Sequence, residues 1–139
     1  MTPAEIQLIR SSFPAICTMP GPLSVLFYGR LFELDPTLRP IFRQDVALQG
    51  RKLMDMLTLV IDNLDHLDSL TPALRALGQR HVGYGVRPEH YAAVSRSFLW
   101  ALGQCLETEF YPDVKAAWAA VLEVISGRMK AGVAELPPG

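Results

Sequence analysis

Cysteine is scarce in this sequence, and the two cysteines that occur are far apart. Cys17 and Cys105 lie in no CxxC or CxxCH context, whereas zinc sites, thioredoxin-type redox sites and covalent cofactor-attachment sites use such spacings. The sequence therefore argues against these three kinds of site. We interpret both cysteines as small buried hydrophobic residues.

Charge of either sign is also limited. Only 19% of the residues are charged, the net charge is −1, and the basic residues are scattered along the chain. A protein that binds nucleic acid or an anionic membrane usually carries a basic patch. We expect neither partner.

Long hydrophobic runs are missing as well. No stretch reaches the roughly 20 apolar residues that a membrane-spanning helix needs. The first residues, Met-Thr-Pro-Ala-Glu, lack the basic region and apolar core of a signal peptide. We therefore expect a cytoplasmic protein.

What the sequence does contain is apolar residues at helical spacing. Half of the residues are hydrophobic, and no segment alternates apolar and polar residues long enough to predict a strand. The class is therefore all-α, with a single domain over residues 1–134 and a short flexible tail over 135–139. Proline, glycine and the apolar spacing predict helices over 2–16, 23–34, 37–42, 53–64, 72–81, 87–106 and 111–129, with an irregular stretch over 45–50.

His81 is the residue most open to a functional interpretation. An imidazole on an apolar helix face is usually a satisfied core or rim residue, and we expect His66 and His90 to be surface residues. Tyr28 and Gln49 could likewise be a core aromatic and a solvated loop residue. If their helices fold back on the helix of His81, however, they form a slot with Leu53 opposite the imidazole. Such a slot can hold haem iron and adjust what binds its sixth position.

Several motifs together resemble the globin family, in particular single-domain bacterial haemoglobins and the haem domain of flavohaemoglobins. They follow one another in the family's order, and the resemblance implies the globin fold, a three-on-three helical sandwich around a haem pocket. The motifs are LFYGRLFELDPTLRPIF (26–42), LQGRKLM (48–54), LGQRHVGYGV (77–86), His90-Tyr91 and AAW (116–118).

The resemblance also implies roles for individual residues around a non-covalent haem b. His81 is the expected proximal iron ligand and Arg80 the expected partner of a haem propionate. The other expected haem contacts are Phe42 on the haem face, Leu77 on the proximal side, Val86, and Tyr91 beneath the histidine. Tyr28 and Gln49 are the expected polar distal pair, and Leu53 the apolar distal residue.

Two local features support this interpretation of His81. The carbonyl of Leu77, one turn earlier, is the expected acceptor for the ring nitrogen that does not bind iron. Gly83 and Gly85 are expected to turn the chain away after the helix.

The function that the resemblance implies is reversible binding of oxygen, carbon monoxide and nitric oxide. The alternative is a nitric oxide dioxygenase that works with a separate reductase. In flavohaemoglobins a glutamate late in the last helix supports the proximal side. Here Val133 stands near that place, with Glu123 too early and Glu135 two residues late, so we expect the proximal network to be incomplete. A haem-free helical interaction module is the remaining structural alternative.

Overall fold

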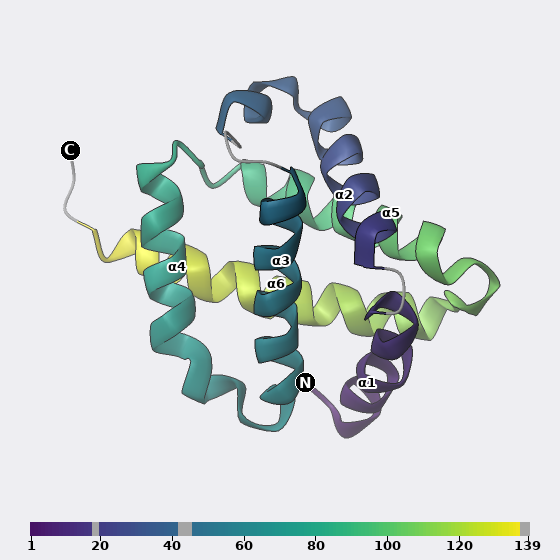
Figure 1. The fold of residues 1–139 in the computed structure, drawn as a ribbon. Coiled ribbons are helices and arrows are strands. Elements are labelled where there is room, and N and C mark those ends of the chain that lie inside the picture. Colours follow the sequence, from purple (N-terminus) through teal and green to yellow (C-terminus); the bar gives the residue numbers. More distant parts are fainter. Residues whose placement is uncertain (18–19, 42–45, 137–139) are drawn as a thin grey trace.

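The computed structural model describes residues 1–17, 20–41 and 46–136, and over these ranges it contains helices and no strand, which confirms the predicted all-α class. The α-helices, which Figure 1 labels, are α1 (Pro3–Cys17), α2 (Pro20–Leu34), α3 (Val46–Asp62), α4 (Thr71–Gly83), α5 (His90–Leu106) and α6 (Pro112–Ala134). The short 3-10 helices η1 (Pro36–Ile41), η2 (Leu64–Leu70) and η3 (Glu107–Glu109) lie between them.

The start of α1 is a capping box. The Glu5 main-chain N–H donates to Thr2 Oγ1 (3.1 Å), and the Thr2 main-chain nitrogen donates to Glu5 Oε1 (2.8 Å). These bonds satisfy two donors that a helix start leaves unpaired. The helix continues past Pro14 to Cys17.

The helices pack so that α6 supports much of the molecule. Figure 1 shows α6, in yellow and green, passing behind α4 and α3, and the most extensive helix contacts join α4 to α6 and α2 to α5. Helix α3 packs mainly on α2. Helices α3 and α4 are not among the extensively packed pairs of the described residues. The position of α3 is therefore set mainly by α2, and that of α4 mainly by α6.

An aromatic cluster forms the centre of the core. Phe98 lies between Phe27 and Trp118, with ring centroids 5.7 and 6.1 Å away. The buried Trp118 indole donates from Nε1 to Ser12 Oγ at 2.9 Å, which satisfies the one polar atom of its side chain. This cluster joins α2, α5, α6 and α1.

Several predicted boundaries need correction. Helix α2 begins at Pro20, before the predicted position 23, and α6 ends at Ala134, after the predicted position 129. Helix α3 begins at Val46, so Gln49 is helical and does not lie in an irregular stretch. Helix α5 begins at His90, since Arg87 to Glu89 precede it as a turn. Among the described helices none is long and apolar enough to cross a membrane.

Candidate functional site

His81 lies near the end of α4 and is oriented by its own helix. The ring Nδ1 is 2.8 Å from the Leu77 carbonyl oxygen. A carbonyl oxygen only accepts hydrogen bonds, so Nδ1 must carry a proton, and in the neutral ring Nε2 then holds the lone pair. The predicted bond to Leu77 is confirmed. An imidazole held in this way can bind a metal ion through Nε2.

The same imidazole is kept neutral by its surroundings. The side chain is half-buried. Burial lowers the pKa of His81; the bond to Leu77 opposes this, and the nearby charge of Arg80 lowers the pKa further. At neutral pH the ring is therefore uncharged, which is the state that a metal ligand requires.

The chain turns directly after His81, and one glycine makes the turn possible. Gly85 has φ +96°, a conformation that side-chain-bearing residues rarely adopt. The Val86 main-chain N–H then donates to the His81 carbonyl oxygen at 3.0 Å. Gly83 is the last residue of α4, so the helix ends there as expected, but of the two glycines Gly85 alone has the positive φ that the turn uses.

Tyr28 and Gln49 come together from α2 and α3. The buried Tyr28 hydroxyl donates to the main-chain oxygen of Gln49 at 3.3 Å. This is longer than the usual 2.7–2.8 Å or so for such bonds, so a better acceptor could replace it. Burial raises the pKa of Tyr28 to about 12. The phenol therefore keeps its proton and remains a donor at neutral pH.

A close helix crossing explains why these two residues meet. A Cβ atom on Gly50 would lie 2.7 Å from Ser24 Oγ, so α2 and α3 approach more closely there than a side chain would allow. Gly50 follows Gln49 directly, and Ser24 precedes Tyr28 by about one turn. Sequence reasoning missed both residues, although the glycine next to Gln49 in LQGRKLM was a usable signal.

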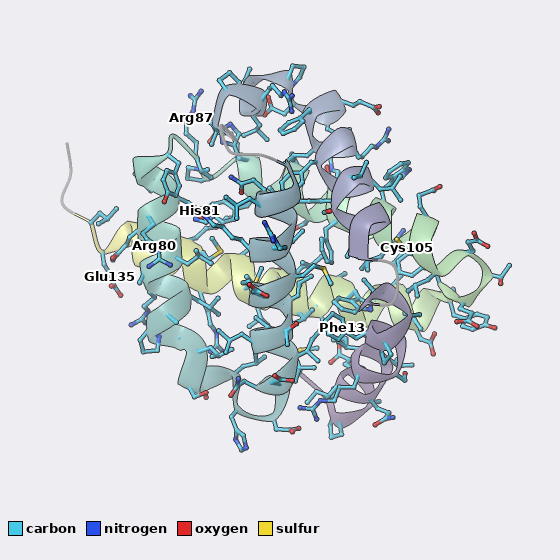
Figure 2. The ribbon with its side chains drawn as sticks, in the orientation of Figure 1. Phe13, Arg80, His81, Arg87, Cys105 and Glu135 are labelled. Carbon is cyan, nitrogen blue, oxygen red and sulfur yellow. The ribbon has the colours of Figure 1, made fainter. Side chains whose placement is uncertain are left out.

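The remaining predicted contacts differ in exposure. Leu53, Leu77 and Val86 are half-buried, as residues around a cofactor slot can be, whereas Arg80 is exposed. Arg80 and His81 are adjacent on α4 and are both labelled in Figure 2. Phe42 lies outside the described residues.

Tyr91 is buried in α5, and its hydroxyl is the polar atom in question. Its hydroxyl makes no hydrogen bond to any described residue, and the Lys130 ammonium lies 5.3 Å from the ring centroid. The late glutamate Glu135 is instead paired with Arg75 at 3.4 Å. Within the described ranges, no carboxylate hydrogen-bonds to His81 or Tyr91.

His90 was expected at the surface and is buried, with 4% of its surface exposed. The Arg87 main-chain N–H donates to His90 Nδ1 at 2.9 Å, and Asp35 Oδ2 lies 3.7 Å from Nε2. The buried ring thus joins the turn before α5 to Asp35, directly after the end of α2. The nearby Asp35-Pro36 and Arg87-Pro88 turns were the available sequence signal.

The helical architecture agrees with comparison to known proteins. The family model described as Globin matches residues 25–129. The chain belongs to the globin family. A solved structure, an engineered carbene transferase described as a candidate nitric oxide dioxygenase from Rhodothermus marinus, superimposes with a TM-score of 0.86. It covers 97% of this chain and 94% of its own at 24% identity, so it supports the globin fold alone.

Curated relatives include a neuroglobin and several flavohemoproteins. Neuroglobin of Tetraodon nigroviridis is 33% identical over 93% of this globin and 90% of its own length. Flavohemoproteins of Xylella fastidiosa and Vibrio cholerae are 30% and 28% identical over 93% and 86% of this chain. The chain spans about one third of the length of these flavohemoproteins, 33% and 31% respectively.

The lowered pKa of His81 predicts a pH dependence of apoprotein stability. Above the ordinary value of 6.5 the ring is neutral both folded and unfolded. As the pH drops below this value, the unfolded chain takes up the proton before the folded protein does. The free energy of unfolding therefore decreases as the pH is lowered, until the pH passes the pKa of His81 in the folded protein. Urea unfolding at pH 7.5 and 5 should show a smaller loss for His81→Gln than for wild type. Equal losses in the two proteins would show that His81 is not held neutral.

Proposed function

We propose that this globin binds haem and uses it to bind oxygen and related diatomic gases reversibly. The observation that carries the proposal is the bond between His81 Nδ1 and the Leu77 carbonyl, which leaves a neutral imidazole with a free Nε2. A haem supplies an iron with one position for such a nitrogen and another for a small ligand.

The residues of the site fit a non-covalent haem b. His81 would hold the iron through Nε2, while Leu53, Leu77 and Val86 would contact the macrocycle with half-buried apolar side chains. Arg80 is exposed on α4 beside His81, and it would pair with a propionate. Phe42 remains part of the proposal from the sequence resemblance.

The distal side offers hydrogen-bond donors for a polar ligand. Tyr28 keeps its proton because its pKa is about 12, and its long bond to the Gln49 carbonyl can be exchanged for a bond to a ligand. The Gln49 amide is a second candidate donor on the same side. Oxygen accepts such bonds better than carbon monoxide, so these donors favour oxygen.

The proximal side favours reversible binding over activation of the ligand. A carboxylate that accepts the Nδ1 proton makes an imidazole a stronger donor to a metal than a neutral carbonyl does. His81 donates to the Leu77 carbonyl, and the Tyr91 hydroxyl has no partner among the described residues. Because the acceptor is a neutral carbonyl, we place gas binding before oxidative chemistry as the proposed function.

A nitric oxide dioxygenase that works with a separate reductase is the second candidate. The flavohemoprotein relatives favour it. Oxygen binding alone gives one stoichiometric reaction with nitric oxide. Sustained consumption of nitric oxide with NADH and an added reductase would instead identify an enzyme.

Removing the imidazole should remove the haem ligand and leave a space that free imidazole can fill. We expect purified His81→Gly to lack the haem Soret band and to recover it when imidazole is added with haem. The matched control is His66→Gly, which changes an exposed histidine and should load haem as wild type does. A normal Soret band in His81→Gly without imidazole would contradict the assignment.

Removing the Tyr28 hydroxyl should speed the release of oxygen. A buried hydrogen bond to a polar ligand contributes roughly 1–3 kcal/mol, so Tyr28→Phe should raise the off-rate about 5- to 150-fold in stopped-flow. Carbon monoxide release should change much less. Tyr111→Phe is the control, because Tyr111 is 59% exposed. An unchanged oxygen off-rate in Tyr28→Phe would show that another group is the donor.

A further inference from the structure

Helix α4 touches α6 backbone to backbone at two glycines. A Cβ atom on Gly78 would lie 2.7 Å from the carbonyl carbon of Met129, and one on Gly132 would lie 2.6 Å from the Cα of Arg75. Both would also collide with the carbonyl oxygen of the same residue. Real Cβ atoms essentially never lie under 3.0 Å from such atoms. Any side chain at either position would therefore push the two helices apart.

This crossing is the main support of α4. The extensive contacts of α4 are with α6, and its other extensive contacts are with η2 at its beginning. Gln79 adds a hydrogen bond across the crossing, from Nε2 to the Gly132 carbonyl oxygen at 3.1 Å. Figure 1 shows α6 passing behind α4. The separation of these helices therefore sets where α4 lies.

Other glycines of the same helices have no such role. A Cβ atom on Gly83 in α4, or on Gly127 in α6, would meet nothing within 4 Å. A glycine inside a helix costs about 1 kcal/mol relative to alanine. At Gly78 and Gly132 the close packing of the two backbones offsets that cost. This packing explains why glycine occurs at these positions despite its low helix propensity.

Gly78 is also close in sequence to His81 and to Leu77, whose carbonyl orients the imidazole. It directly follows Leu77, whose carbonyl accepts the Nδ1 bond, and it precedes His81 by three residues. A displacement of the helix at Gly78 therefore moves the acceptor and the ring together. Such a displacement would leave the Nδ1 bond intact while changing where Nε2 lies.

We infer that Gly78 and Gly132 are positioning residues for His81. They set the distance between α4 and α6 and thereby the position of the His81 Nε2 atom. This inference rests on the proposed haem function. A role in stability alone would predict a lower free energy of unfolding with the haem ligation unchanged. A positioning role predicts that the bond between iron and imidazole changes as well.

The test compares the same substitution, glycine to alanine, at two positions in the crossing and at two positions outside it. We expect ferrous Gly78→Ala and Gly132→Ala to show a shifted or broadened iron–histidine stretching band in resonance Raman spectra. Haem transfer to an excess of apomyoglobin should be faster by about fivefold or more. Gly83→Ala and Gly127→Ala should match wild type in both measurements. A wild-type band in folded Gly78→Ala and Gly132→Ala would overturn the inference.

Gln79→Met covers the case in which neither glycine variant folds. It removes the bond to the Gly132 carbonyl without adding volume at the crossing, and we expect a smaller change of the same band. An unchanged band in this variant would then overturn the inference. If wild type itself takes up no haem and shows no such band, the proposed function fails before the positioning role is tested.

Discussion

The hydrogen bond between His81 Nδ1 and the Leu77 carbonyl is the interaction on which the candidate site depends. At 2.8 Å and within one helical turn, it fixes both the tautomer and the direction of the ring. Burial lowers the pKa of the same imidazole, so the ring stays neutral and Nε2 keeps its lone pair. Gas binding and nitric oxide chemistry would both need that lone pair, because both require an iron that is bound to His81.

The two walls of the site are positioned by separate helix crossings. On one side α4 rests on α6 where Gly78 and Gly132 allow backbone contact, and on the other α2 meets α3 at Ser24 and Gly50. Helices α3 and α4 are not extensively packed on each other among the described residues. The imidazole and the Tyr28 hydroxyl are therefore positioned by different helix crossings.

The sequence predicted the helical class and the local chemistry of His81, because helical spacing and an acceptor one turn away are local properties. The bond to Leu77 belongs to this group. Contacts between distant segments were harder to predict. His90 was expected at the surface, but the fold buries it beside Asp35, which is far away in the sequence. The glycine crossings were not predicted for the same reason: a glycine in a helix can indicate a close approach, but it does not identify the helix that approaches.

Haem titration of the wild-type apoprotein is the most direct measurement of the central claim that this globin holds haem through His81. With the absorbance followed at the Soret band, the signal should rise to a sharp end point at about one haem per chain. The reduced product should then show an iron–histidine stretching band in its resonance Raman spectrum. An absorbance that grows without saturation, or a saturated complex without that band, would contradict ligation by His81.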